Sequence, residues 1–385
     1  MGLNDVKEWL HYCGRCNSCK YIYRDYQNSC PAYIKFFFEP YTSSGKIWMA
    51  LDLYQGKYDW SPSIVDKVFS CTLCGNCTIQ CQQEAGKHAL DIFEALREEA
   101  VEKGIGPLDA HKQFLENIEK EDNPYGDPKK DRFKGVPKEY FNDDADVIYY
   151  VGCTTAYREK QLFESVIPIL QKLEVNFTLL EDEVCCGSPL LTTGQFKAAK
   201  RLAEQNARII LEKKGSTVIA SCAGCLRTLK SQYEKKYGIK IEKEVLHLSE
   251  FLSQKLKILK KLYKKSKKNM DIATYHDPCH IGRHLGIFEE PRKVLKSIPG
   301  IQFIEMGRNR ENAWCCGAGA GVKSALKDWA VEISEERIKE AEETKAKYLV
   351  TTCPFCERNL RDAAEKLNSD IEIIDLCQLV LKKLN

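Results

Sequence analysis

Ten of the nineteen cysteines in this 385-residue chain form two copies of one pattern, and this duplication constrains the fold more than any other feature. Each copy has a single cysteine, then two adjacent cysteines followed by glycine, then two cysteines separated by two residues. The copies comprise Cys153, Cys185, Cys186, Cys222 and Cys225, and Cys279, Cys315, Cys316, Cys353 and Cys356. Corresponding cysteines lie 126 to 131 residues apart, so two homologous lobes are the simplest interpretation.

Both copies sit in sequence that is typical of alternating strands and helices. Apolar, strand-like runs end at a single cysteine in 146–153, 216–222, 271–279 and 347–353. The spacing of apolar residues in 197–215 and 324–343 predicts helices between them. Strand, helix, strand in each lobe predicts an α/β fold with parallel sheets, and the cysteines should gather beyond the carboxyl ends of the strands.

Eight further cysteines lie near the amino terminus in two runs. One run contains Cys71, Cys74, Cys77 and Cys81, and the other contains Cys13, Cys16, Cys19 and Cys30, with Pro31 after the last. Three cysteines at three-residue intervals favour a [4Fe-4S] cubane, because zinc normally takes its ligands as separated pairs.

The fourth cysteine of each run is expected to bind the cubane of the other run, as in two-cluster ferredoxins. Cys13, Cys16, Cys19 and Cys81 should then hold one cubane, and Cys71, Cys74, Cys77 and Cys30 the other. The gap before Cys30 is ten residues, where the ferredoxin run has three.

Composition and residue pattern divide the chain into four segments. We expect a helical two-cluster ferredoxin-type domain over 1–105, a polar linker rich in Pro, Gly and Asp over 106–145, lobe one over 146–268 and lobe two over 269–385. In lobe two, Cys377 has no place in the cysteine pattern and corresponds to Ser249 of lobe one, so we interpret it as a buried structural thiol.

The charge and hydropathy of the chain exclude several classes of protein. The 58 basic and 55 acidic residues nearly balance, so no nucleic-acid partner is required. No apolar run is long enough to span a bilayer. The first thirteen residues reach Cys13 without the apolar region of a signal peptide, and we therefore expect a cytoplasmic protein with reduced thiols.

Five thiolates in each lobe exceed what one cubane or one zinc ion uses. A non-cubane cluster in which one thiolate bridges two irons would need five. The stretches HDPCHIGRHLGIFEEPRKVL (276–295), NAWCCGAGAGVK (312–323) and CPFCERNL (353–360) resemble the cysteine-rich CCG domains of heterodisulfide reductase catalytic subunits. With the ferredoxin module in front, the whole chain resembles the fused form of that family.

This resemblance implies an enzyme in which each set of five cysteines holds a non-cubane [4Fe-4S] cluster. The two clusters would face a disulfide, one beside each sulfur, and the two cubanes would supply electrons one at a time. The substrate implied is the coenzyme M–coenzyme B heterodisulfide if the source is a methanogen, and a related disulfide otherwise. The alternative is a non-catalytic electron-transfer subunit of a glycolate, lactate or glycerol-3-phosphate dehydrogenase, or of a quinone-linked membrane complex.

Either function requires a partner subunit that supplies electrons. The resemblance implies a cytochrome b-like membrane protein or a flavin or iron–sulfur subunit, through which the chain would lie peripherally on the cytoplasmic face of a membrane. Three histidines near the second pattern, His276, His280 and His284, are expected to make ordinary hydrogen bonds rather than to transfer protons. Arg283 and Lys323 are interpreted as surface charges.

Overall fold

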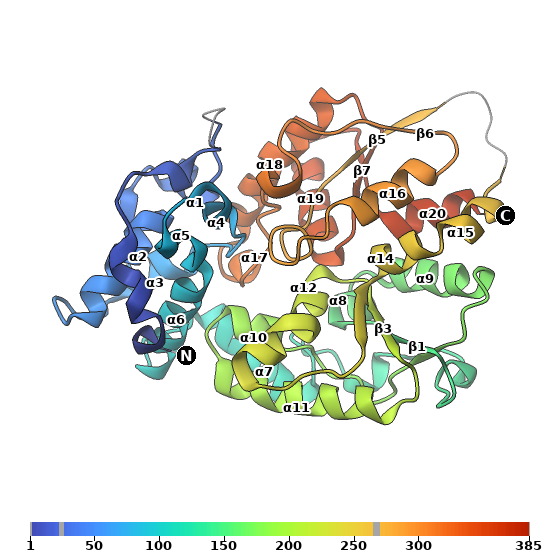
Figure 1. Ribbon diagram of the computed structural model, residues 1–385, viewed down its shortest axis with the longest axis horizontal. Helices are drawn as coiled ribbons and strands as arrows, with labels where there is room; N and C mark the ends of the chain where they lie inside the picture. Colours follow the sequence, from blue (N-terminus) through green and yellow to red (C-terminus); the bar gives the residue numbers. More distant parts are fainter. Residues whose placement is uncertain (1, 23–26, 265–269, 385) are drawn as a thin grey trace.

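The computed structural model describes residues 2–22, 27–264 and 270–384, and it places a helical amino-terminal unit against two α/β lobes (Figure 1). The amino-terminal unit contains a 3-10 helix (Leu3–Tyr12), α1 (Pro31–Phe36), α2 (Ser43–Tyr54), α3 (Pro62–Phe69), α4 (Asn76–Gln80), α5 (Glu84–Lys87) and α6 (Ala89–Glu102). Helix α6 is central to this unit because Ile92, Phe93 and Leu96 on it are fully buried in the core.

Lobe one is built on a parallel sheet with the strand order β2-β1-β3-β4. Its strands are β1 (Val147–Tyr150), β2 (Phe177–Leu179), β3 (Thr217–Ala220) and β4 (Glu244–His247). Its helices are α8 (Cys153–Tyr157), α9 (Lys160–Lys172), α10 (Ser188–Thr192), α11 (Phe196–Glu212), α12 (Ala223–Arg227), α13 (Tyr233–Tyr237), α14 (Leu248–Gln254) and α15 (Leu256–Leu262).

Lobe two repeats this design, with the strand order β6-β5-β7-β8 in a second parallel sheet. Its strands are β5 (Asp271–Tyr275), β6 (Ile301–Phe303), β7 (Tyr348–Thr351) and β8 (Glu372–Asp375). Its helices are α16 (Glu289–Ser297), α17 (Val322–Ala325), α18 (Lys327–Glu343), α19 (Pro354–Leu367) and α20 (Leu376–Lys383). The predicted α/β class with parallel sheets is confirmed.

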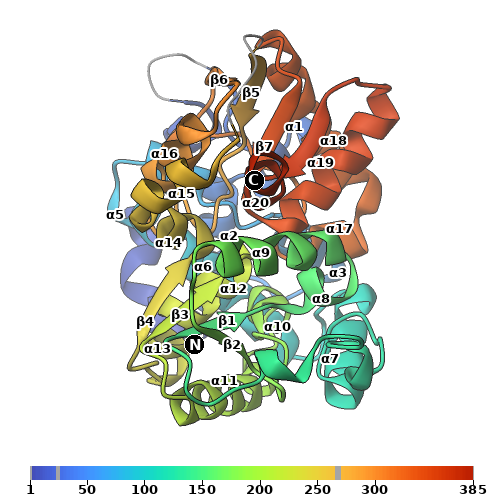
Figure 2. The same cartoon turned by 90° about the vertical axis from the view of Figure 1, so that its right-hand side faces the viewer.

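The two lobes pack reciprocally (Figure 2). The last helix of lobe two, α20, packs against α9 of lobe one, and α14 of lobe one packs against α16 of lobe two. These two contacts are equivalent under the duplication, because α9 and α16 each follow the first strand of a lobe. Cys377 on α20 is 4% exposed within the apolar core that this packing creates, as expected of a structural thiol.

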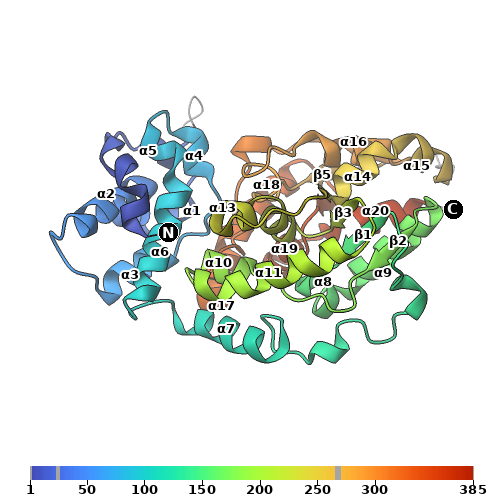
Figure 3. The same cartoon turned by 60° about the horizontal axis from the view of Figure 1, so that its bottom comes forward.

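Residues 106–145, expected as a linker, contain α7 (Asp109–Glu121), and this helix contacts both α10 of lobe one and α17 of lobe two (Figure 3). His111 on α7 is fully buried, and its Nε2 lies 2.9 Å from the carbonyl oxygen of Gly321. The segment is therefore packed onto the lobes as well as connecting them to the amino-terminal unit. None of the described helices is long and apolar enough to cross a membrane.

Arg97 on α6 joins the amino-terminal unit to both lobes. Its guanidinium is fully buried, and Nη1 donates hydrogen bonds to the carbonyl oxygens of Thr192 in lobe one (2.6 Å) and Ala320 in lobe two (3.0 Å). Nη2 donates to the carbonyl oxygens of Val68 (3.0 Å) and Cys71 (2.5 Å). Burial lowers the pKa of Arg97 to about 10, so the side chain is still a cation at neutral pH.

Replacing Arg97 with methionine should weaken the attachment of the amino-terminal unit to the lobes. Four buried carbonyl groups lose a charged donor, and each such loss costs about 1–3 kcal/mol. We expect the free energy of unfolding to fall by at least about 3 kcal/mol in denaturant titrations. The control is Arg201→Met, because the side chain of Arg201 is 49% exposed and bonds to Asp122, Gln205 and, at 3.4 Å, the carbonyl oxygen of Ile118. Equal stability of the two variants would contradict this role for Arg97.

Candidate functional site

The cysteines of both lobes follow the carboxyl ends of the strands. Cys153 begins α8 after β1, and Cys222 and Cys353 are the N-caps of α12 and α19 after β3 and β7. Because the carboxyl ends of parallel strands meet at one edge of a sheet, residues far apart in the chain converge there. In addition, Gly187 and Gly317, which follow the paired cysteines, have φ angles of +84° and +78°, a conformation that favours glycine.

All ten cysteines of the two lobes line a single cavity between them. The cavity has an empty volume of about 1030 Å³, including its open mouth. Every one of these cysteines except Cys279, which is partly exposed, is buried, and none forms a disulfide. The Sγ atoms of Cys316 and Cys356 lie 3.1 Å apart. A hydrogen bond between Cys222 and Cys353, one from each lobe, raises the pKa of Cys353 to about 11.

The chemistry of this cavity fits an iron–sulfur cluster in each lobe. Burial raises the pKa of Cys279 to about 12. Hydrogen bonds between neighbouring thiols lower the pKa of Cys186 and Cys316 but raise that of Cys185, Cys225 and Cys356, so the protein by itself does not keep all of these thiols as thiolates at once. Metal binding requires thiolates, and iron supplies the positive charge that stabilises them. A set of sulfur donors facing one cavity, without disulfides, is the arrangement that such a cluster needs.

The paired cysteines are fixed through their backbone in both lobes. In lobe one, Tyr233 donates to the carbonyl oxygen of Cys186 (2.8 Å) and Asn206 to that of Cys185 (3.0 Å). In lobe two, the carbonyl oxygen of Cys316 accepts hydrogen bonds from Ser334 (2.6 Å) and Asn359 (2.5 Å). These buried polar side chains hold each pair rigidly, so that both sulfurs face the cavity.

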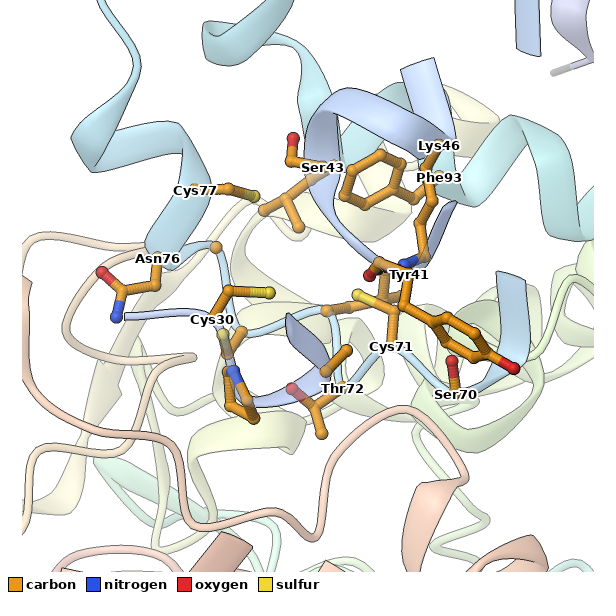
Figure 4. Close-up of a pocket in the computed structure, with 16 residues that line it drawn as sticks. Cys30, Tyr41, Ser43, Lys46, Ser70, Cys71, Thr72, Asn76, Cys77 and Phe93 are labelled. Carbon is orange, nitrogen blue, oxygen red and sulfur yellow. Dashed lines mark hydrogen bonds between the residues drawn. The ribbon is translucent and has the colours of Figure 1, made fainter. Parts of the chain in front are cut away.

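The amino-terminal cysteines separate into two groups that exchange members between the two sequence runs. Cys30 lines a pocket together with Cys71, Cys74 and Cys77 (Figure 4). The buried Lys46 lines the same pocket, and its positive charge opposes the effect of burial, which raises the pKa of Cys30 to about 11.

Cys81 lies with the other run. Burial raises the pKa of Cys81, and the neighbouring thiols of Cys16 and Cys13 raise it further. Burial likewise raises the pKa of Cys19 to about 12, and Cys30, Cys81 and Cys13 add to this effect. Cys16 is the one exposed cysteine among all nineteen. The two groups are defined here as the outer set (Cys13, Cys16, Cys19, Cys81) and the inner set (Cys30, Cys71, Cys74, Cys77).

The inner set adjoins lobe two. A hydrogen bond that Cys74 donates to Cys315 raises the pKa of Cys74, and the Sγ of Cys315 also bonds to Oγ1 of Thr72 (3.4 Å). Arg283 spans this boundary, because it donates from Nε to the carbonyl oxygen of Cys74 (2.8 Å) and from Nη1 to that of Ala313 (2.6 Å). The inner set is therefore in direct contact with the cysteines of lobe two.

Interpreting Arg283 and Lys323 as surface charges was wrong. Arg283 is partly buried between the inner set and lobe two. The side chain of Lys323 is 11% exposed, pairs with Asp362 (2.5 Å) and donates to Asn359 (2.7 Å). Neither side chain lines the shared cavity. Single basic residues carry no sequence signal that separates a buried bridge from an exposed charge.

The three histidines differ from one another. His276 accepts a hydrogen bond at Nδ1 from Nε of Arg337 (3.2 Å), and its ring lies within 4.8 Å of the sulfurs of Cys316 and Cys356. His280 lines the cavity, and its ring centroid is 4.9 Å from that of His284. The ordinary hydrogen bond expected of these residues is present at His276.

Sequence reasoning missed a buried ion pair beside lobe one. Nη1 of Arg132 lies 2.7 Å from Oε1 of Glu183, and Nη2 donates to Sγ of Cys153 at 3.2 Å. The carboxylate of Glu183 also accepts from the backbone N–H groups of Val151 (2.7 Å) and Gly152 (2.9 Å). Arg132 belongs to the segment expected as a linker, where its sequence surroundings carry no motif. The position of Glu183, two residues before the cysteine pair, is the only signal that could have drawn attention to the site.

Comparisons with known proteins agree with this arrangement. The model of the cysteine-rich CCG domain matches residues 147–230 and 273–361, and that of a 4Fe-4S dicluster domain matches residues 9–85. The chain is therefore an iron–sulfur protein. In fold, it is similar to a hypothetical protein from Helicobacter pylori (TM-score 0.55, 12% identity, 90% of this chain and 68% of the other).

Several similar curated proteins come from methanogens. A subunit of the dihydromethanophenazine:CoB--CoM heterodisulfide reductase of Methanosarcina acetivorans is 42% identical over 83% of this chain and 78% of its own length. The corresponding protein of Methanosarcina barkeri is 41% identical over 86% and 82%. A subunit of the fumarate reductase (CoM/CoB) of Methanothermobacter marburgensis is 31% identical over 98% and 72%. This chain belongs to the family of these heterodisulfide reductase subunits.

Proposed function

We propose that this chain is the disulfide-reducing iron–sulfur subunit of a heterodisulfide reductase-type oxidoreductase. The observation that carries the proposal is that ten cysteines, five from each lobe, line one cavity. A substrate disulfide in this cavity would have one complete cysteine set beside each of its sulfurs. The electron-input module would lie in 1–105, and the lobes in 146–268 and 269–385.

The proposed ligands follow the groups described above. The outer set (Cys13, Cys16, Cys19, Cys81) and the inner set (Cys30, Cys71, Cys74, Cys77) would each hold a [4Fe-4S] cubane. Each lobe would hold a non-cubane [4Fe-4S] cluster on its five cysteines. When bound, such clusters supply single electrons, and reduction of a disulfide to two thiols takes up two electrons and two protons.

The cavity wall also suits a disulfide. Apart from the cysteines, its described lining is apolar, small or uncharged, with Phe114, Tyr125 and Phe355 as the large side chains. Such a wall excludes water from the sulfur–sulfur bond and leaves the polar parts of a substrate at the open mouth. His280 is the titratable side chain other than cysteine and Tyr125 in this lining, and burial lowers its pKa to about 3, so as a neutral ring it would be placed to donate a hydrogen bond to a product thiolate.

Because the two Methanosarcina relatives named above are subunits of a CoB–CoM heterodisulfide reductase, we propose the coenzyme M–coenzyme B heterodisulfide or a related disulfide as the substrate. Membership of a multi-subunit enzyme implies partner subunits. The exposed Cys16 marks the outer end of the series, so we propose that the electron donor binds there. The donor would be a cytochrome b-like membrane protein or a flavin or iron–sulfur subunit, which would hold the chain peripherally on the cytoplasmic face.

The first test is the metal content. Protein purified without oxygen should contain about sixteen irons per chain, from two cubanes and two non-cubane clusters with four irons each, and negligible zinc. Iron and zinc can be quantified by mass spectrometry on the same sample. About eight irons together with stoichiometric zinc would mean that the lobes are zinc sites, and would contradict the proposal.

The second test concerns the exchange of Cys30 and Cys81 between the cubanes. Each cubane should give its own electron paramagnetic resonance signal, so reference variants identify the signals. Cys81→Ser should weaken the same signal as Cys16→Ser, and Cys30→Ser the same signal as Cys74→Ser, because each pair would share a cubane. If Cys81→Ser instead weakened the signal that Cys74→Ser weakens, each cubane would be built from a single sequence run.

The third test asks whether the two lobes act together. Cys186→Ala and Cys316→Ala should each lower heterodisulfide reduction with a viologen donor by about 100-fold or more, and the double variant should lose little further, because groups that act as a unit are not additive. The cubanes should still be reducible in all three variants.

Cys377→Ser provides the matched control for this test. This buried cysteine lies outside the cavity and corresponds to Ser249 of lobe one, so the variant should retain activity. Near-normal turnover by either single-lobe variant would exclude joint action of the lobes. Absence of disulfide turnover in the wild type would favour the alternative electron-transfer subunit.

A further inference from the structure

The two lobes repeat the same cysteine pattern, but the charges that surround the cysteines differ. In lobe one, the guanidinium of Arg132 contacts Sγ of Cys153 (3.2 Å) directly. The side chain of Arg132 is 2% exposed and that of Glu183 is fully buried. The buried structure of lobe one therefore includes a hydrogen bond from the cation of Arg132 to the sulfur of Cys153. The carboxylate of Glu183 holds Arg132 in place, and two backbone N–H groups fix this carboxylate.

Lobe two lacks the counterpart of this pair. The duplication aligns Glu183 with Ala313, and Gly152 with Pro278, which has no N–H to donate. Among the described residues, no charged side chain donates a hydrogen bond to a cysteine sulfur of lobe two. Arg292 and Asp277 do form a buried ion pair there (2.6 Å), but Arg292 donates to Asp277, Glu305 and a backbone carbonyl.

Arg283 is a guanidinium whose charge acts on lobe-two cysteines, Cys279 and Cys315. It donates to the backbone carbonyls of Cys74, Ala313 and Glu311, so its hydrogen bonds fix the backbone between the inner set and lobe two. Its charge is shared between these two groups of cysteines. The direct contact between a cation and a sulfur thus distinguishes lobe one from lobe two.

A hydrogen bond and a positive charge at a ligand sulfur stabilise the more negative, reduced state of a metal centre. We infer that Arg132 is a positioning residue that raises the reduction potential of the lobe-one site above that of the lobe-two site. This inference rests on the proposed function, because it requires a cluster on the lobe-one cysteines. Since lobe two adjoins the inner set, the higher potential would lie at the end of the series farthest from the electron input.

Glu183 sets the size of this effect. Its carboxylate offsets much of the charge of Arg132, so removing the carboxylate charge should leave a stronger net positive charge beside Cys153. Glu183→Gln keeps an oxygen that can accept from Val151 and Gly152. Arg132→Gln and Glu183→Gln are therefore expected to shift the lobe-one potential in opposite directions, a result that a purely structural role for the pair would not give.

The experiment is a potentiometric titration of the full, anaerobically purified chain, followed by electron paramagnetic resonance and accompanied by iron analysis. The lobe-one signal is identified by its absence from Cys186→Ala, and the lobe-two signal by its absence from Cys316→Ala. In Arg132→Gln, the ratio of reduced to oxidised lobe-one site at a fixed potential should fall about tenfold, which is about 59 mV for a one-electron couple. In Glu183→Gln it should rise, and the lobe-two signal should not move in either variant.

Two further variants complete the design. Arg132→Lys keeps the positive charge but lacks the planar guanidinium with its paired N–H donors. It should shift the lobe-one reduction potential less than Arg132→Gln does. Arg158→Gln is the matched control, because Arg158 also forms an ion pair with a partner from 106–145, Asp127 (2.7 Å), but has no hydrogen bond to a cysteine. It should leave both potentials unchanged.

The possible outcomes separate this inference from the proposed function. A normal lobe-one signal that neither Arg132→Gln nor Glu183→Gln moves would overturn the role of Arg132, as would equal shifts in both lobes. If Arg132→Gln loses lobe-one iron, its potential cannot be compared, and Glu183→Gln becomes the test. A lobe-one reduction potential that falls or stays unchanged in Glu183→Gln would then overturn the inference. A wild-type protein without a lobe-one signal would overturn the proposed function itself.

Discussion

Burial of closely spaced sulfur atoms is the constraint on which the rest of this structure depends. Ten thiols from two lobes face one cavity, and burial there raises the pKa of a thiol such as Cys279 to about 12. Thiolates are stable in such a place only beside positive charge, which iron supplies in an iron–sulfur protein. The protein contributes rigidity: glycines with positive φ, strand ends and buried polar side chains fix each cysteine before metal is bound.

The position of the amino-terminal unit follows from a second buried cation. Arg97 donates hydrogen bonds to carbonyl groups of its own unit and of both lobes. Nearby, Glu94 of the same helix forms buried ion pairs with Arg227 (3.1 Å) and Lys236 (2.6 Å) of lobe one. These contacts hold the amino-terminal unit against both lobes, and Cys74 and Cys315 are hydrogen-bonded neighbours at its boundary with lobe two. Electron transfer requires short, fixed distances, and a rigidly docked module provides them.

Duplication gives the lobes the same backbone design without making them equivalent. The reciprocal packing of α20 on α9 and of α14 on α16 brings the two cysteine sets face to face. The amino-terminal unit breaks this symmetry, because its inner set adjoins lobe two at Cys315, while the segment that follows the unit contributes Arg132 to lobe one. Two similar cysteine sets with different neighbouring groups suit a reaction in which electrons arrive from one side.

The sequence by itself determined the features that depend on local spacing. The repeated cysteine pattern predicted two α/β lobes with cysteines at strand ends, and the strand-like runs predicted parallel sheets. The exchange of Cys30 and Cys81 was predicted from the resemblance of the two runs to two-cluster ferredoxins. The structure groups these residues accordingly, although their binding of metal stays a prediction. The shared cavity was expected from the family resemblance, whereas only the tertiary structure decided that lobe two adjoins the inner set and that Arg97 and Arg132 are buried at these junctions. The contacts of Arg97 with Ala320 and of Arg132 with Glu183 span 223 and 51 residues, and a lone arginine has no periodicity or motif that could reveal its distant partner.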